Sequence, residues 1–482
     1  MKTQTALKPA RIAALLAAMT AASLTPGFAA NLYWDAAATS PWLTATNWST
    51  DLAGENQAAA APTISDDVIF NSTPFNGAAN SAAVGGNIAA RSLTFSSGAG
   101  MTLSHGNNTW SLALGAGGIT VGEGSSGTIG TSSGSLFTEA TVSQTWANNS
   151  SGALTVRRLR ASNSATGVTT VTLSANSTGN ISFNNSISDS ADGTKQLGIV
   201  IDSAGTGTVT LLGAGTSSTS GGTWTGGTTV RRGVLAVGTA AVGTGSVNIG
   251  ASSGNTATLR IGNNTIAFTS SIVADSSSGT NQLELSSTTA GTTVSSSITL
   301  DGNLTVAANR SSTISGAITG SGDLIKGQFQ GGNSALLTLT GTNTYSGDTV
   351  INNGAFTLGE VGSLTFYIGA DGVNNQVNGT TNSAVNFIGS FNFNVTSAEL
   401  VDGNSWTIVN LANTAESYGV GFTVAGFNYD AQENVWTNGG FTFDTTSGLL
   451  TYAAIPEPAS FAALAGAGLL GLALMRRQRR SV

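Results

Sequence analysis

The sequence predicts an all-β protein built mainly as a parallel β-solenoid, in which short strands stack coil upon coil, closed by an antiparallel β cap. Three observations lead to this fold class. Glycine makes up 64 of the 482 residues, while charged residues make up only 9%, far below the usual share. A segment that predicts two short strands and two turns occurs twice, and the two copies align without a gap. Apolar helices are expected only at the two ends of the chain, as targeting signals.

The composition excludes several kinds of reactive site. The chain has no cysteine, which rules out disulfides, zinc–cysteine sites, iron–sulfur clusters and thiol nucleophiles. It has a single histidine, so histidine-ligated metal centres are not expected. Glycine lacks the strict every-third-residue period of collagen. We therefore expect a body without a cofactor or a metal ion.

Residues 1–29 have the pattern of an export signal. Three basic residues precede an apolar stretch of about 13 residues, and small residues stand at Gly27 and Ala29. The alternative is a membrane anchor, but the stretch is short of the roughly 20 residues that span a bilayer. We predict export by the Sec machinery and cleavage after Ala29.

Residues 30–75 are predicted to form an aromatic-rich N-terminal cap. They contain Trp34, Trp42 and Trp48 close together along the chain. Clustered tryptophans at the end of a solenoid shield the first coil from water. Tryptophan faces also stack on sugar rings, which makes these three residues the candidate carbohydrate-stacking site. Both interpretations stay open at this stage.

Residues 76–360 are predicted to be the solenoid, with repeats near 181–238 and 314–359. Within them, residues 224–238 align on residues 345–359 at a constant offset of 121. An aromatic residue, three glycines and two alternating apolar stretches coincide in the two copies. Self-similarity of this kind is the sequence signature of a repeat architecture.

Each aligned copy predicts a strand, a turn, a second strand and a second turn. β-branched runs at 228–230 and 349–351 suit a pleated surface. Gly233 and Gly354 follow where a tight turn needs a positive φ. Such short strands cannot build a sandwich core, so we expect coils that bury their apolar faces against one another. At about 20–30 residues a coil, the body would hold on the order of 15 coils.

The second copy also resembles a known family. Its runs at 314–326, 337–350 and 353–359 are similar to the autotransporter-associated β-strand repeat, with insertions around 328–333. The first copy is a weaker match, because Ser-rich residues precede Trp224. The resemblance implies a right-handed β-helix of the kind found in exported passenger structures. Asn-Asn pairs recur between the β-runs, and we expect them at corners, where Asn tolerates left-handed backbone.

Residues 361–453 change in character and carry stronger, aromatic-rich strands. Examples are the runs at 387–395, 406–409 and 440–443. We predict a compact antiparallel β-subdomain here that closes the solenoid. Solenoids need such a cap, because an open end invites pairing with another chain.

Residues 454–482 combine three ordered parts. The triplet Pro456-Glu457-Pro458 comes first, and an uncharged apolar stretch follows over residues 459–475. A basic cluster then ends the chain, formed by Arg476, Arg477, Arg479 and Arg480. The stretch is just long enough for a membrane-spanning helix, and arginines of this kind stay on the cytoplasmic side.

This end resembles the PEP-CTERM sorting signal. The resemblance implies export across the inner membrane of a Gram-negative bacterium and transient anchoring there. It also implies processing near Pro456-Glu457-Pro458 by an exosortase, a transpeptidase-like membrane enzyme, in a host that makes exopolysaccharide. The alternative is a plain C-terminal anchor that is not processed.

Other residues with chemical potential are interpreted structurally. The single histidine, His105, is expected in an exposed turn. Arg158 and Arg160 are expected on a solvated strand face that they share with Val156, paired with acidic neighbours. Paired carboxylates are expected mainly in turns, which Asp favours; they are Asp66/Asp67, Asp189/Asp192, Asp371, Glu399/Asp402 and Asp430/Glu433. We predict no catalytic residue, no metal site and no enzyme activity.

The expected function is that of an exported β-helix protein with a structural or adhesive role at the cell surface or in the extracellular matrix. Removing residues 1–29 and 459–482 removes seven of the 17 basic residues and no acidic one, which leaves a net charge of about −14. Such a body repels nucleic acid. The expected partners are the sorting enzyme, the Sec machinery and an exopolysaccharide or other glycan. Two alternatives are a carbohydrate-binding surface protein and a polysaccharide-active enzyme on the solenoid face.

Overall fold

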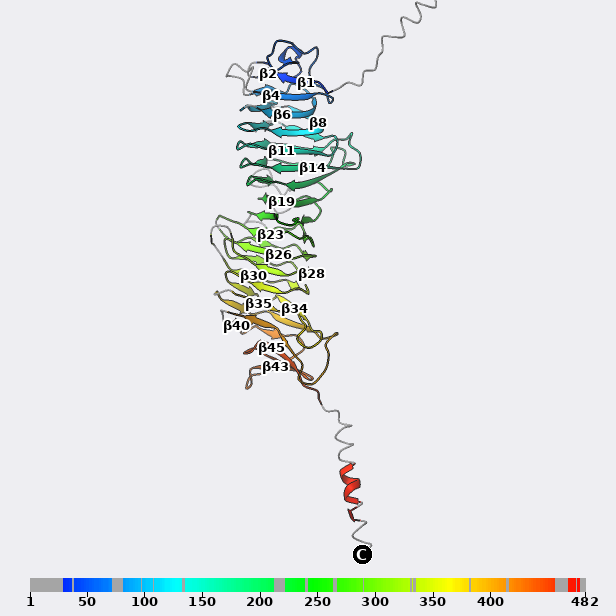
Figure 1. Cartoon of the computed structure of the whole chain (residues 1–482), viewed down its shortest axis with the longest axis vertical. Coiled ribbons are helices and arrows are strands. Elements are labelled where there is room, and N and C mark those ends of the chain that lie inside the picture. Colours follow the sequence, from blue (N-terminus) through cyan, green and yellow to red (C-terminus); the bar gives the residue numbers. More distant parts are fainter. Residues whose placement is uncertain are drawn as a thin grey trace, which may run out of the picture. The chain divides into compact units, whose positions relative to one another are not determined.

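The computed structural model describes residues 29–36, 39–71, 81–96, 98–106, 108–131, 135–211, 222–238, 242–262, 267–288, 290–329, 332, 335–380, 383–412, 416–455, 467–473 and 475–476. These residues form an all-β solenoid of about 11 turns with a small antiparallel sheet towards the C-terminal end (Figure 1). The chain divides into two compact units, one ending at Gly198 and one beginning at Ile199. The division falls inside strand β17 (Gln196–Asp202).

Parallel strands stack above one another in the first unit (Figure 1). One stack runs through β4, β6 and β8, and the long strand β8 then pairs with both β10 and β11. A second stack runs through β5, β7, β9, β12 and β15. The elements of this unit are β1 (Asn31–Trp34), β2 (Ser40–Pro41), the 3-10 helix η1 (Ala45–Asn47), β3 (Trp48–Ser49), β4 (Asp67–Asn71), β5 (Ser81–Ala83), β6 (Ile88–Ser96), β7 (Gly100–Ser104), β8 (Thr109–Val121), β9 (Ser126–Ile129), β10 (Ser135–Ala140), β11 (Gln144–Asn148), β12 (Leu154–Val156), β13 (Arg158–Ala161), β14 (Val168–Ala175), β15 (Ile181–Phe183) and β16 (Ile187–Ser188).

The core of the first unit consists of columns of apolar side chains, one from each coil. One column is fully buried and lies in register across five strands; its members are Val68, Leu93, Ile119, Trp146 and Leu173. The alternation of buried and half-exposed residues along each strand produces these columns, because successive side chains point to opposite faces. Each buried aliphatic side chain contributes about 1.5–3 kcal/mol.

The second unit stacks its strands in the same way. The long strand β19 pairs through its first half with β17 and β20 and through its second half with β18 and β21. Further parallel ladders follow, among them β24, β27, β30, β33, β36 and β40. The strands are β18 (Thr208–Leu211), β19 (Thr228–Val237), β20 (Val247–Ile249), β21 (Thr256–Ile261), β22 (Ile272–Ala274), β23 (Thr280–Leu285), β24 (Thr293–Val294), β25 (Ile298–Leu300), β26 (Leu304–Ala308), β27 (Ser312–Ile314), β28 (Ile318–Gly320), β29 (Leu324–Lys326), β30 (Leu337–Leu339), β31 (Thr342–Asn343), β32 (Thr349–Ile351), β33 (Phe356–Leu358), β34 (Ser363–Tyr367), β35 (Val377–Gly379), β36 (Val385–Phe387), β37 (Ser390–Asn394), β38 (Ser405–Thr407), β39 (Val409–Leu411), β40 (Glu416–Tyr418), β41 (Thr423–Val424), β42 (Asn428–Asp430), β43 (Val435–Asn438), β44 (Phe441–Asp444) and β45 (Leu449–Tyr452).

The two aligned repeat copies share a glycine at positive φ and an aromatic hydrogen bond, but the first copy runs through Gly233 as the single strand β19, whereas the second is divided into β32 and β33. Gly233 has a φ of 84° and Gly354 a φ of 73°, which confirms the positive φ predicted for both. The leading aromatic of each copy is buried and hydrogen-bonds the threonine four residues later: Trp224 donates to Thr228, and Tyr345 shares a hydrogen bond with Thr349.

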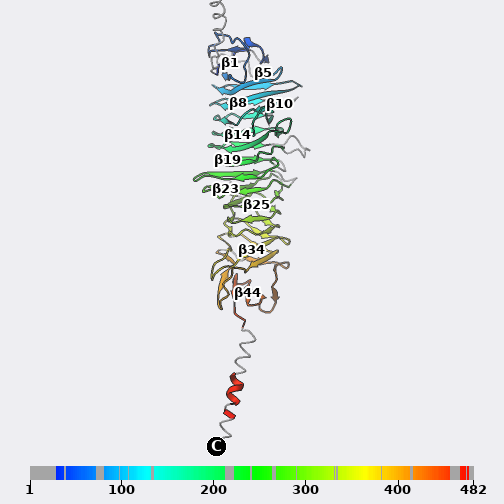
Figure 2. The same ribbon diagram turned by 90° about the vertical axis from the view of Figure 1, so that its right-hand side faces the viewer.

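The parallel coils continue beyond residue 360, the predicted end of the solenoid. Strands β34 and β37 pair in parallel and place Phe366 beside Phe393, so aromatic residues predicted to form an antiparallel subdomain extend the coil stack instead. The antiparallel sheet is smaller than predicted and consists of β38 and β42 to β45. Figure 2 labels β44 of this sheet and β34 of the parallel coils. Its buried Phe443 packs against Phe391 and Phe393, so the sheet does cover the last coils.

Two further expectations change. The described residues form about 11 turns rather than on the order of 15. Among the described residues, positive φ at a non-glycine position occurs only at Thr39 and Asn434, so the described members of the Asn-Asn pairs do not use left-handed backbone. Asn148, for example, stabilises a corner with its side chain: the side-chain amide donates hydrogen bonds to the carbonyls of Gly152 and Asn180.

Candidate functional site

The C-terminal segment leaves the body directly after the antiparallel sheet. The amide of Ala453 donates to the carbonyl of Gly440, and the amide of Ala454 donates to Oδ1 of Asp402 at 3.0 Å. Asp402 is one of the carboxylates expected in turns, and it accepts this hydrogen bond just before the predicted sorting motif. The predicted sorting segment therefore begins two residues after β45.

Most of the predicted targeting residues lie outside the described residues. These are the signal peptide before Ala29, the triplet Pro456-Glu457-Pro458, and the arginines Arg477, Arg479 and Arg480. Ala29 and Arg476 are described, and both are exposed. A seven-residue helix covers residues 467–473 in the predicted anchor, and its three leucines are mostly exposed. Within the part of the chain that the structure describes, no helix has both the length and the apolar character needed to cross a membrane.

The tryptophans of the N-terminal cap are core residues. Trp34, Trp42 and Trp48 are completely buried. The ring of Trp48 packs edge-on against Trp34 at 4.9 Å and against Trp42 at 4.8 Å, and all three contact Phe70 of β4. Because no ring face is exposed, a sugar cannot stack here in this structure. The prediction of a cap fits this packing, and the stacking site must be corrected.

The single histidine also differs from its prediction. His105 is buried, with 3% of its surface exposed, although it was expected in an exposed turn. Its Nδ1 accepts a long hydrogen bond of 3.5 Å from the amide of Thr131, which lies one coil further on. The turn is made by the following Gly106, which has a φ of 57°. The side chain of His105 faces the neighbouring coil.

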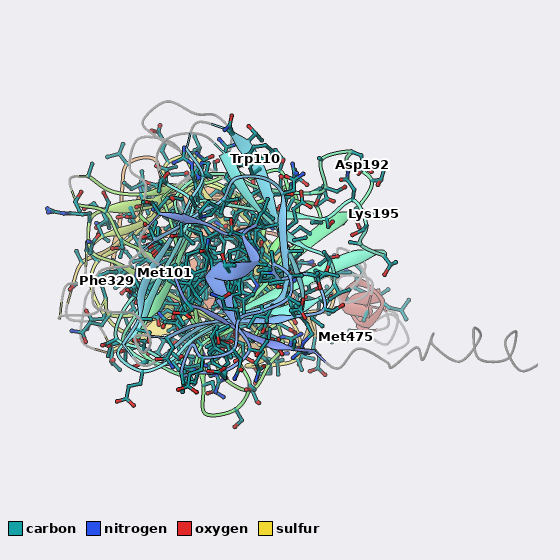
Figure 3. The ribbon with its side chains drawn as sticks, turned by 90° about the horizontal axis from the view of Figure 1, so that it is seen from above. Met101, Trp110, Asp192, Lys195, Phe329 and Met475 are labelled. Atoms are coloured by element: carbon teal, nitrogen blue, oxygen red, sulfur yellow. The ribbon has the colours of Figure 1, made fainter. Side chains whose placement is uncertain are left out.

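The candidate carboxylates mainly stabilise turns, as expected. Hydrogen bonds from Ser190 and Thr194 lower the pKa of Asp192 to about 2, in a loop that Figure 3 shows at the rim beside Lys195. Asp66 and Asp430 accept hydrogen bonds within their own turns, from Thr63 and Gln432. Asp371 differs, because it accepts from the amide of Ser405, 34 residues further along the chain. Among the described residues, no three His, Asp or Glu side chains are grouped closely enough to hold a metal ion.

Ion pairs connect adjacent coils rather than forming a separate site. The four pairs among the described residues are Arg91–Asp67, Arg160–Glu139, Arg232–Asp202 and Arg260–Glu284. The pairing expected for Arg160 is thus confirmed. The predicted shared face is wrong, because a bend at Arg157 separates β12 from β13, so Val156 is buried while Arg158 faces outward.

Sequence reasoning missed two buried polar groups. Lys326 points into the core with 1% exposure, and its Nζ donates to the carbonyls of Gly327 and Asn353 at 3.0 and 3.1 Å. Asn343 is equally buried, and its side-chain amide group hydrogen-bonds to its own coil and to the coils before and after it. The strict alternation along Leu324-Ile325-Lys326 was a usable signal for the lysine, because it places Lys326 on the same face as Leu324.

The fold and the junction at Ala454 define a class of protein, a β-solenoid body that carries a short C-terminal segment. A family model described as the PEP-CTERM protein-sorting motif matches this segment at residues 454–480. The motif implies an exported protein that is sorted to the cell envelope by an exosortase-type enzyme. No curated protein and no solved structure matches the chain.

Proposed function

We propose that this chain is an exported, exosortase-sorted protein whose solenoid is a structural or adhesive component of the cell surface or extracellular matrix, without enzymatic activity. The observation that carries the proposal is the sorting-motif match at 454–480, which begins two residues after β45. A non-catalytic role fits the body, because its carboxylates stabilise turns and its core is filled with apolar columns. The likeness to the autotransporter-associated β-strand repeat, with its right-handed coil, belongs to the same proposal.

Delivery follows from the two ends of the chain. The Sec machinery exports the chain, and cleavage after Ala29 releases the N-terminus. Residues 459–475 then hold the chain in the inner membrane until the sorting enzyme acts at the Pro-Glu-Pro triplet. The exposed leucines of the helix at 467–473 support this step, since apolar side chains favour lipid over water. The cytoplasmic arginines of the proposed anchor are Arg476, Arg477, Arg479 and Arg480.

The test is fractionation of the native host. Wild-type chain is compared with a variant in which Pro456, Glu457 and Pro458 are replaced by alanine, and with Ser460→Ala as a matched control. We expect the triple variant to stay in the inner-membrane fraction with an intact C-terminus, while wild type and control reach the surface in a shortened form. Mass spectrometry of the C-terminus measures the shortening. Identical location and mass for all three chains would overturn the sorting proposal.

Carbohydrate binding is the second candidate function. It no longer depends on Trp34, Trp42 and Trp48, whose rings are buried. The observation that favours it is a group of arginines on the outer face of the first unit. The polysaccharide-active enzyme has no comparable observation in its support.

A further inference from the structure

A cluster of positive charge stands out on the acidic body. Residues 30–458 contain ten basic side chains, and three of them are Arg157, Arg158 and Arg160. Arg160 is neutralised by Glu139, which accepts a hydrogen bond from Nε at 2.9 Å and a second from the guanidinium. Arg157 and Arg158 have no ion-pair partner among the described residues. The cluster therefore carries a local excess of two positive charges.

An aromatic ring fixes the positions of the Arg158 and Arg160 side chains. Phe137 lies directly beside Arg158 in the parallel pairing of β10 with β13. The guanidinium carbon of Arg158 is 5.0 Å from the centre of the Phe137 ring, and that of Arg160 is 4.1 Å from it. Cation–π contacts of this kind restrict long side chains that would otherwise move freely. The guanidinium groups of Arg158 and Arg160 are thus held on the outer face of the coil before any ligand arrives.

Two of the guanidinium donors lack a partner. The Nε atoms of Arg157 and Arg158 are both buried, and neither makes a hydrogen bond. The stem of Arg157 lies over Gly130 of the previous coil, where an added Cβ would come within 3.0 Å of the arginine Cβ. Burial, and then the charge of Arg157, lowers the pKa of Arg158. Because both Nε atoms are closed to solvent, a ligand would meet the terminal Nη groups of the two guanidiniums.

We propose that Arg157 and Arg158 form a binding site for the carboxylate of an acidic polysaccharide. A planar carboxylate matches the fork of donors that a guanidinium presents. The next coil supplies exposed or half-exposed polar groups beside the arginines, Asn184 and Ser186, which suit sugar hydroxyls. A nucleic acid would need a basic stripe along its backbone, and these two arginines do not supply one.

This inference deepens the proposed surface function, on which its biological meaning rests. Its test is nevertheless independent, because binding by the purified chain does not require sorting. Failure of the binding test would leave the sorting proposal intact, and failure of the fractionation test would leave the binding result standing.

The experiment measures binding of the full-length chain to polygalacturonate by calorimetry, with uncharged dextran and poly-glutamate as comparisons. The test variant is R157Q/R158Q. The matched control is R231Q/R310Q, which removes the same charge from two exposed arginines elsewhere. Circular dichroism checks that both variants remain folded. We expect the test variant to bind polygalacturonate at least about tenfold more weakly, the control to bind like wild type, and added salt to weaken binding.

Three outcomes would overturn the proposal. In the first, wild type does not bind polygalacturonate even at low salt. In the second, the control variant loses as much affinity as the test variant, which would indicate net charge rather than a site. In the third, poly-glutamate binds as tightly as polygalacturonate, which would assign the cluster to acidic peptides instead. A Phe137→Ala variant adds a readout of positioning, since it should weaken binding without changing charge.

Discussion

Asn343 is the position at which the structure makes its sharpest prediction about stability. The side chain lies in β31 with 1% exposure. Its Nδ2 donates to the carbonyl of Gly341 and, one coil further on, to that of Ser363, both at 2.9 Å. Its Oδ1 accepts from the amide of Ile318 in the previous coil at 3.2 Å. One side chain thus connects three successive coils.

The substitution Asn343→Ala removes all three hydrogen bonds and leaves one buried donor and two buried acceptors with fewer partners. At about 1 kcal/mol for each bond, the expected loss is about 3 kcal/mol of the free energy of unfolding. Asn352→Ala is the matched control, because Asn352 is an exposed asparagine at a corner of the same repeat. The control should lie within about 0.5 kcal/mol of wild type.

Urea unfolding measures the two free energies, and hydrogen-exchange mass spectrometry localises the effect. The peptide containing Ile318 should lose protection in Asn343→Ala and keep it in Asn352→Ala. The reasoning is refuted if the two variants have equal stability, or if Asn343→Ala is destabilised while exchange at Ile318 stays unchanged.

Three further predictions concern packing, charge and backbone. Burial lowers the pKa of Lys326 from 10.5 to about 8. Between these two pH values the unfolded state binds more protons than the folded state, so the free energy of unfolding should rise with pH, by on the order of 2 kcal/mol. Urea midpoints at a series of pH values from 7.5 to about 9.5 measure this rise, which Lys326→Met should abolish; a flat wild-type profile would contradict it. Trp48→Ala should cost about 3–5 kcal/mol in urea unfolding, whereas Trp436→Ala, at a half-exposed ring, should cost clearly less, and equal losses would argue against the cap. Gly233→Ala should cost about 1–3 kcal/mol, because its φ is 84° and an added Cβ would lie 2.6 Å from a side chain of the previous coil; Gly85→Ala, with open space around it, should be neutral in the same assay.

The solenoid could be predicted because its information is local. Alternation, short β-branched runs and glycine turns are all visible within one coil, and the alignment of 224–238 on 345–359 located Gly233 and Gly354 at positive φ. The sorting segment could be predicted for the same reason, since its three parts are contiguous.

The direction of strand pairing could not be predicted from such local signals. The aromatic run at 387–395 alternates with period two, and this pattern is the same in a parallel coil and in an antiparallel sheet. The direction of pairing depends on the partner strand, and Phe391 lies beside Leu364 of a parallel coil. Trp48 presents the same problem, because shielding and sugar stacking require the same residue type and differ only in exposure.

The burial of Asn343 and Lys326 depends on which way each side chain faces, and residue type alone does not indicate this direction. The sequence made no prediction for Asn343, whose amide group bonds to the neighbouring coils. Lys326 was passed over within a repeat motif. For Asn343, a single coil gives no information about the groups that the coils above and below present to it. The alternation along Leu324-Ile325-Lys326, in contrast, does place Lys326 on the inward face.

The polar groups between coils also explain how this fold achieves a unique register. In the second unit, Leu235, Leu259 and Leu283 form one buried column, and their apolar contacts would be nearly as good if a coil paired with the wrong neighbour. Stability in a solenoid is approximately a sum of such nearest-neighbour interfaces, so apolar columns alone specify the stack weakly. The Arg260–Glu284 pair and the amide of Asn343 are different, because each fits one particular partner on the adjacent coil. We infer that the apolar columns supply most of the free energy of folding and that the inter-coil polar contacts determine which coils stack.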